Sequence, residues 1–141
     1  MINIYIGTDA RGLYRRDRGH TWYLMETEYK GRHLIKKEHI SWMECNRNGA
    51  VLEGLIYSLR QIRAPGAEIH IYTSNEYVCG YFSSLEEWRR RGFMNKKGKP
   101  IKYRNIWVSI AEVIHKKRLQ IYFHRKMPDE KIGELKNIRD A

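Results

Sequence analysis

One apolar stripe at helical spacing constrains the fold of this chain more than any other feature. Apolar residues recur at three- and four-residue intervals from Val51 to Ile62, which predicts an amphipathic helix with one broad buried face. Pro65-Gly66 ends this unit, and residues 69–72 then predict a strand that finishes at residues 73–76. A helix between two strands makes a crossover, so we expect this strand to lie parallel to the first one.

The residues before this helix predict three antiparallel strands. Residues 2–6 alternate apolar and polar side chains, the period of a strand, and Gly7-Thr8-Asp9 closes the run. Residues 20–28 and about 33–43 read as the next two strands, and the turn at 29–32 contains a glycine, as a hairpin requires. The chain therefore opens with a meander.

The residues after the fourth strand complete an α/β pattern. We expect a helical region at about 76–91, a further helix at about 105–117, a fifth strand at 119–124 and a short amphipathic helix after residue 129. A chain of 141 residues is long enough for one sizeable core but not for two, so residues 1–141 are interpreted as a single domain. The predicted fold is a mixed five-stranded sheet, three antiparallel strands followed by parallel ones, flanked by helices.

Positive charge is concentrated in the second half of the chain. The formal net charge is +11, and residues 89–126 contain thirteen lysines and arginines but only Glu112 as an acid. The densest part is the stretch 88–102, in which cations lie beside large rings. Such a stretch suits a nucleic-acid backbone, although a solvated basic turn is an equally simple interpretation.

Composition also limits the location and the covalent chemistry of the chain. No stretch approaches the roughly 20 apolar residues that are needed to span a membrane, and no apolar leader is visible. Cys45 and Cys79 lie far apart and have no metal-binding spacing, so two free thiols are expected. We therefore expect a soluble, cytoplasmic protein with no membrane partner.

Five short motifs, in order along the chain, resemble those of type 1 ribonuclease H. The resemblance extends over nearly the full length and agrees with the predicted order of strands and helices. The motifs are Thr8-Asp9, the turn 29–32, Asn46-Arg47, the segment 72–78, and the basic stretch 88–102 with Ile106-Trp107 after it.

The resemblance implies cleavage of the RNA strand of RNA/DNA hybrids by two Mg²⁺ ions, which four carboxylates hold on either side of the scissile phosphate. Asp9 matches the first of these acids. The second falls on Gly49 or Ala50, the third on Ser74, and the fourth close to Gly133. At least two of the four ligands are therefore absent.

Neighbouring acids offer an alternative set of ligands for Mg²⁺ or Mn²⁺ beside Asp9. They are Glu53, Glu76, Glu130 and Glu134. A carboxylate displaced by one helical turn moves about 5 Å, which is more than metal coordination tolerates, so we expect no cofactor unless the fold brings these acids together.

The features that the resemblance associates with holding a duplex are better represented. The candidate nucleic-acid-binding residues are Asn46, Arg47, Arg89, Arg90, Arg91, Phe93, Lys96, Lys97, Lys99 and Lys102. Among the rings, Phe93 is expected to be exposed, whereas Trp88 and Trp107 are expected in the core.

These observations predict a nucleic-acid-binding ribonuclease H-like protein that is catalytically inactive and holds RNA/DNA hybrid or another A-form-like duplex by a basic protrusion. One alternative is an active or weakly active endonuclease that uses Asp9 with the displaced acids. Another is an interaction module whose basic face meets an acidic protein. The sequence leaves the oligomeric state open.

Overall fold

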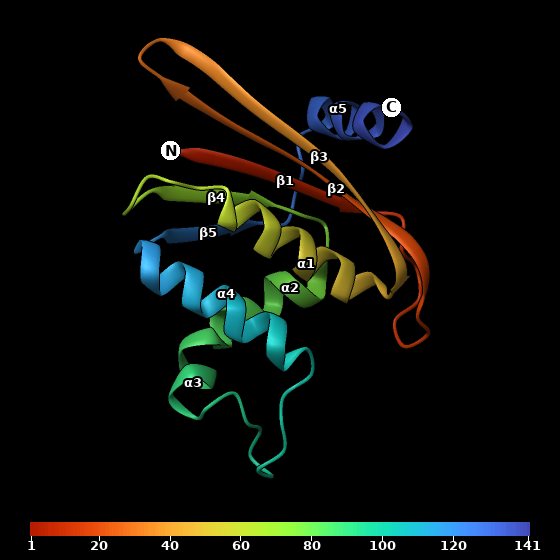
Figure 1. Ribbon diagram of the computed structural model, residues 1–141, viewed down its shortest axis with the longest axis vertical. Helices are drawn as coiled ribbons and strands as arrows, with labels where there is room; N and C mark the ends of the chain where they lie inside the picture. Colours follow the sequence, from red (N-terminus) through yellow and green to blue (C-terminus); the bar gives the residue numbers. More distant parts are fainter.

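One mixed sheet of five strands organises the molecule. The computed structural model describes all residues 1–141, and its sheet has the strand order β3-β2-β1-β4-β5 (Figure 1). The strands are β1 (Ile2–Thr8), β2 (Asp17–Tyr29), β3 (Arg32–Cys45), β4 (Glu68–Tyr72) and β5 (Gln120–His124). The predicted mixed sheet with flanking helices is confirmed.

Strand pairing confirms the predicted crossover. β1 pairs with β2 in antiparallel register, Ile4 opposite Met25, and with β4 in parallel register, Ile4 opposite Ile71. β4 and β5 are also parallel, with Ile71 opposite Phe123. The carboxyl ends of β1, β4 and β5 therefore meet at one edge of the sheet.

The β2–β3 hairpin is longer than the sequence pattern indicated. β2 begins at Asp17 rather than at residue 20, and β3 continues to Cys45. A register shift between Asp17 and Gly19 marks an irregular start, which explains why simple alternation did not reveal it. The turn of the hairpin extends beyond the other strands (Figure 1).

Six helical segments accompany the sheet. They are α1 (Arg47–Arg60), α2 (Glu76–Tyr81), the 3₁₀ turn η1 (Phe82–Ser84), α3 (Leu85–Arg90), α4 (Arg104–Lys117) and α5 (Asp129–Asp140). The single helical region predicted at 76–91 is thus divided into three short pieces. None of these helices is long and apolar enough to cross a membrane.

The main core lies between α1, α4 and one face of the sheet. Its fully buried members include Ile4, Leu55, Ile69 and Trp107. A Cβ atom added at Gly54 would lie 2.5 Å from Cγ2 of Thr21, so glycine lets α1 approach β2 closely. The apolar stripe that predicted α1 is the face that packs here.

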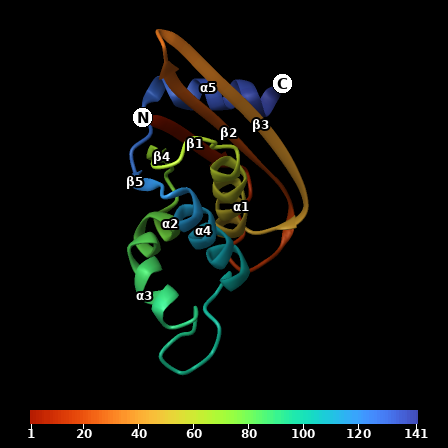
Figure 2. The same ribbon diagram turned by 60° about the vertical axis from the view of Figure 1, so that its left-hand side comes forward.

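The opposite face of the sheet is covered by α5 over β1 and β2 (Figure 2). Leu135 and Ile138 of α5 form a second, smaller core with Tyr5, Trp22 and Leu24. The two helical layers hold the sheet from both sides and leave its carboxyl-terminal edge open between α1 and α5.

Candidate nucleic-acid interface

The basic stretch forms a protrusion between α3 and α4 that points away from the sheet (Figures 1 and 2). Asn95 organises its turn, because its Oδ1 atom accepts hydrogen bonds from the backbone N–H groups of Lys97 and Lys99 at 2.9 and 3.0 Å. Met94 and Pro100 pair as an isolated antiparallel bridge. This small hairpin leaves Lys96, Lys97 and Lys99 exposed at its tip.

The three consecutive arginines do not share one environment. Arg91 lies 3.0 Å from Glu87 and Arg89 lies 3.9 Å from Glu86, both as exposed pairs within one short segment. Arg90 makes no ion pair. Because exposed pairs are worth at most about 1 kcal/mol, a polyanion can displace the two glutamates.

Phe93 is buried, and the expectation of an exposed ring is wrong. Its backbone has φ 61°, in the left-handed region, and its side chain is only 8 % exposed. The left-handed turn folds the ring back into the main core, where Trp107 also lies. Phe93 therefore anchors the protrusion rather than presenting a stacking surface.

The two tryptophans beside the protrusion have the predicted structural role. Trp107 is fully buried and Trp88 packs against the main core. Their ring centroids lie 5.3 Å apart at 65°, an edge-to-face arrangement that fixes α3 against α4.

Asn46 and Arg47 lie at the start of α1 and play different roles. Asn46 is the N-cap, with its Oδ1 accepting from the backbone N–H of Gly49 at 2.8 Å and from the hydroxyl of Tyr103 at 2.7 Å. The side-chain carbonyl oxygen of Asn46 therefore already accepts two hydrogen bonds. Arg47 is exposed and makes no ion pair, so its guanidinium is available to an anion.

Lys102 connects the base of the protrusion to the loop after β1. Its Nζ lies 4.8 Å from the ring centroid of Tyr14 and 5.2 Å from that of Tyr103. The same loop is fixed to α1, because the backbone N–H of Arg47 donates to the carbonyl of Gly12 at 2.8 Å. The loop after β1 thus contacts both the base of the protrusion and the start of α1.

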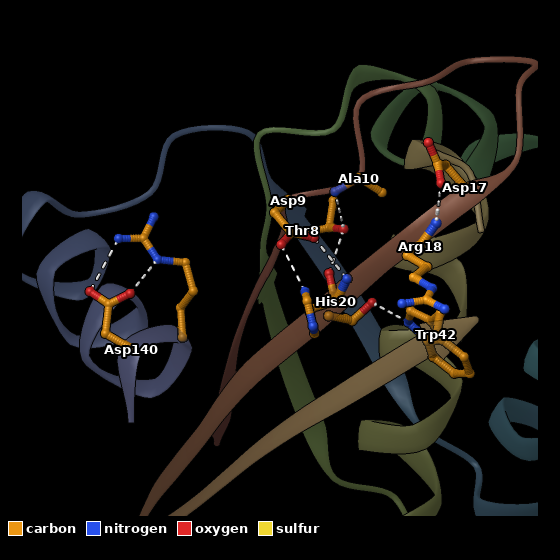
Figure 3. A network of polar contacts seen from close by, with 10 residues as sticks. Thr8, Asp9, Ala10, Asp17, Arg18, His20, Trp42 and Asp140 are labelled. Carbon is orange, nitrogen blue, oxygen red and sulfur yellow. Dashed lines mark hydrogen bonds and ion pairs between the residues drawn. The ribbon is translucent and has the colours of Figure 1, made fainter. Parts of the chain in front are cut away.

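Asp9 is held by a histidine on the neighbouring strand (Figure 3). Its Oδ1 accepts from the backbone N–H of His20 at 2.7 Å, and its Oδ2 lies 2.8 Å from His20 Nδ1. Partial burial would raise the pKa of the Asp9 carboxyl, but the side-chain and backbone hydrogen bonds of His20 outweigh it and lower that pKa. Both carboxylate oxygens of Asp9 are therefore engaged.

The four neighbouring acids lie in separate environments. Glu76 is 3.9 Å from Arg125, and Glu134 is 3.3 Å from Lys131. Glu53 is half-buried on α1, where burial raises its pKa against the opposing effect of Arg60. Glu130 is exposed in the first turn of α5.

The side chains present do not fit a two-metal centre. The structure contains no group of three or more His, Cys, Asp and Glu side chains that could hold a metal ion. The resemblance places acids at Gly49 or Ala50, at Ser74 and close to Gly133, and none of these four residues offers a carboxylate. Two divalent ions need several anionic oxygen ligands, which this arrangement does not supply.

A pocket of about 740 Å³ lies at the carboxyl-terminal edge of the sheet. Gly7 and Thr8 of β1 and Thr73 and Ser74 after β4 contribute to its wall. Its charged lining is mostly basic and consists of Arg47, Arg125, Lys126, Lys136 and Arg139, with Glu76 as the only acid. We call this the cationic pocket.

Four of these cations were missed by reasoning from the sequence. Arg125 and Lys126 follow β5, and Lys136 and Arg139 lie three residues apart on α5. The position of Arg125 and Lys126 directly after a predicted strand was the available signal. The amphipathic pattern of α5 indicated which of its faces packs on the sheet. It did not indicate that Lys136 and Arg139 reach the carboxyl-terminal edge, because that depends on where the helix lies on the sheet.

The fold and this basic edge define an α/β protein of the ribonuclease H-like class. A family model for RNase H matches residues 2–125, and the chain belongs to that family. Ribonuclease H of Thermus thermophilus is 30 % identical over 82 residues, which are 56 % of this chain and 49 % of that protein. Ribonuclease H of Bordetella pertussis is 28 % identical over 86 residues, which are 60 % of this chain and 55 % of that protein. The chain spans about half the length of these curated relatives.

Solved structures show the same fold. The solution structure of the PFV RNase H domain has a TM-score of 0.72 at 19 % identity and covers 97 % of this chain and 90 % of that chain. LC11-RNase H1, solved in complex with RNA/DNA hybrid, has a TM-score of 0.61 at 18 % identity and covers 100 % and 96 %. A foamy viral protease-reverse transcriptase, solved in complex with dsDNA, has a TM-score of 0.75 at 19 % identity and covers 97 % and 90 %.

Proposed function

We propose that this chain is a nucleic-acid-binding member of the ribonuclease H family that holds RNA/DNA hybrid or another A-form-like duplex and does not cleave it by the two-metal reaction. One observation carries the proposal. The lysines and arginines of the protrusion and Arg47 are exposed, whereas the acids that a two-metal reaction needs are not assembled around Asp9.

The basic protrusion supports binding through phosphates. Each phosphate that a lysine or arginine neutralises releases counterions, so the affinity should fall steeply as salt rises. Arg90 and the three tip lysines are exposed and make no ion pair, so they are free to contact a duplex backbone. The solved complexes with RNA/DNA hybrid and dsDNA among structures of the same fold agree with such a partner.

Recognition should depend on duplex shape rather than on base sequence. The major groove of an A-form duplex is too deep and narrow for side chains, so 2′-hydroxyl and phosphate groups remain as contacts. The protrusion offers point charges and no exposed aromatic ring, because Phe93 is buried. These features favour backbone contacts over stacking on bases.

The experiment compares RNA/DNA hybrid, double-stranded RNA and double-stranded DNA of one sequence, with binding and cleavage measured side by side. Affinity is measured across a range of salt concentrations for the wild type and for the variant Arg89→Glu/Arg90→Glu/Arg91→Glu. Loss of up to three phosphate contacts should flatten the log–log salt slope by up to about 3. A chain with Lys37→Glu on β3 serves as the control for a charge change elsewhere.

Two results would overturn this function. Cleavage of hybrid in Mg²⁺ or Mn²⁺ that an Asp9→Asn variant abolishes would establish an active endonuclease. Absence of binding to all three duplexes at low salt would leave an acidic protein as the partner of the basic surface.

A further inference from the structure

The cationic pocket is lined mainly by positive side chains, whereas a metal-binding site is lined by negative ligands. Arg47, Lys126 and Lys136 line it and make no ion pair with any acid of the chain. The ion pair of Arg125 is long, with 3.9 Å between its guanidinium and the exposed carboxylate of Glu76. Cations gathered around one cavity repel one another, and an anion bound among them relieves that repulsion.

A buried amide network adds a hydrogen-bond donor to the pocket. The Oδ1 atom of Asn75 accepts from the backbone N–H of Val78 at 2.9 Å, so its Nδ2 must act as the donor. That Nδ2 donates to Oδ1 of Asn48 at 3.0 Å. The bond uses the acceptor of Asn48 and leaves its own N–H groups without a protein partner, in a side chain that lines the pocket and belongs to a residue only 8 % exposed.

The network is rigid because Asn75, at its centre, has three hydrogen-bond partners. The hydroxyl of Thr73 accepts from the backbone N–H of Asn75 at 3.2 Å, and Thr73 is 2 % exposed. The end of β4, the start of α2 and the first turn of α1 are therefore held together at this point. A donor fixed in this way loses little freedom when it binds a ligand.

The floor of the pocket is apolar. Ile6, Trp22, Val51 and Leu135 lie among its lining residues and are buried in the two cores. A low-polarity floor strengthens electrostatic attraction at the rim, because less water screens the charges. The volume of about 740 Å³ lies in the range of pockets that hold small organic ligands.

We infer that the cationic pocket binds the phosphate group of a nucleotide directly, through Arg47, Lys136 and the amide of Asn48, with no divalent ion between protein and phosphate. Arginine can contact two phosphate oxygens at once, lysine adds a point charge, and the amide N–H groups give direction. The inference goes beyond the proposed function, because the phosphate can belong to a duplex strand or to a free nucleotide.

The test titrates adenosine 5′-monophosphate and inorganic phosphate into the protein in EDTA and follows binding by calorimetry or amide chemical shifts. Binding should persist in EDTA, and addition of Mg²⁺ should not strengthen it. Lys136→Glu and Arg47→Glu should each weaken binding about tenfold or more, as expected for loss of one charge-assisted contact. Lys37→Glu, the same charge change on β3, should leave it unchanged.

A second pair of variants separates hydrogen bonding from charge. Asn48→Leu removes the donor without a charge change and should weaken nucleotide binding, whereas Lys136→Gln should have a smaller effect than Lys136→Glu. Circular dichroism and thermal unfolding confirm that each variant is folded. If Arg47→Glu and Lys136→Glu bind the nucleotide as well as Lys37→Glu does, or if binding requires Mg²⁺, the inference is wrong.

Duplex binding distinguishes the source of the phosphate and the two proposals. Loss of duplex affinity in Lys136→Glu indicates a strand phosphate, and unchanged duplex affinity with lost nucleotide binding indicates a free nucleotide; both results support the pocket. Arg90→Glu should weaken duplex binding but not nucleotide binding. Nucleotide binding without any duplex binding would overturn the proposed function and leave the pocket standing.

Discussion

Lys131 of α5 and Glu26 of β2 form a buried ion pair, with Nζ 2.9 Å from Oε2 and both side chains 10 % exposed. The hydroxyl of Tyr5 donates to Oε1 of the same carboxylate at 2.8 Å, and His33 Nε2 lies 3.1 Å from Oε2. The carboxylate is thus surrounded by partners. This cluster attaches α5 to the sheet beside the small core of Leu135 and Ile138.

Replacing Lys131 with methionine should destabilise the protein strongly. The substitution keeps an apolar stem of similar length but leaves the buried carboxylate of Glu26 without its cation, which costs about 3–5 kcal/mol. Urea unfolding followed by circular dichroism measures this loss. The double variant Glu26→Leu/Lys131→Met removes both charges and should recover much of the stability. If the double variant is as unstable as the sum of the single ones, the pair is not coupled.

The free energy of unfolding should fall when the pH drops below about 4.5. Burial would raise the pKa of Glu26, but hydrogen bonds from Lys131, Tyr5 and His33 lower it below its ordinary value of 4.5. A lowered carboxyl pKa in the folded state gives stability that is complete above pH 4.5 and is lost as pH falls through the folded value.

Urea unfolding at a series of pH values measures this dependence. The stability difference between the wild type and Glu26→Gln should be constant above about pH 5 and should shrink below it. Once Glu26 is protonated, the wild type is uncharged at this position, as the variant already is. Glu28→Gln, an exposed change on the same strand, is the control. A difference that stays the same down to pH 2 would show that the charge of Glu26 does not contribute.

The fold was predictable because its main signals are local. The apolar stripe of α1, the alternation in β1 and the glycine turn at 29–32 each fix one element. The crossover rule then fixes the direction of β4. The division of residues 76–90 into α2, η1 and α3 was not predictable, since it depends on how Trp88 and Leu85 pack against the core.

The candidate site was predictable only in part. The exposed cations of the protrusion follow from the sequence, because a run of lysines and arginines can only face solvent or an anion. The engagement of Asp9 by His20 depends on the antiparallel register that pairs Thr8 with Thr21. The direction of the Phe93 ring depends on a left-handed residue, and side-chain type gives no sign of it.

Truncation of Phe93 to alanine should destabilise the protein and weaken duplex binding together. The ring fills part of the main core, so its loss should cost about 3–5 kcal/mol. It also anchors the hairpin whose tip carries Lys96 and Lys97, and a mobile tip loses more freedom on binding. Thermal unfolding and duplex titration of the same samples measure both effects.

Lys96→Ala is the contrasting variant for Phe93→Ala, since it should weaken duplex binding with stability unchanged. A Phe93→Ala protein of normal stability would contradict the buried anchor.

Two helical glycines should respond in opposite ways to alanine. Gly133 lies within α5 with open space where a Cβ would be, so Gly133→Ala should stabilise the protein by about 0.5–1 kcal/mol through helix propensity. A Cβ at Gly49 would lie 2.8 Å from Oδ1 of Asn46 and 3.3 Å from Cε1 of Tyr103. It must displace the acceptor that caps α1, and loss of a cap costs about 1 kcal/mol.

The pair also tests why an acid is absent from the start of α1. If Gly49→Ala lowers the melting temperature while Gly133→Ala raises it, the contact between Asn46 and Tyr103 excludes any larger side chain, glutamate included, at residue 49. Introducing Ser74→Asp and Gly133→Asp would then still leave the second position without a ligand, and no Mg²⁺-dependent cleavage of hybrid should appear. Equal stabilisation by both alanines would show that Asn46 yields easily, and that the start of α1 can accept a carboxylate.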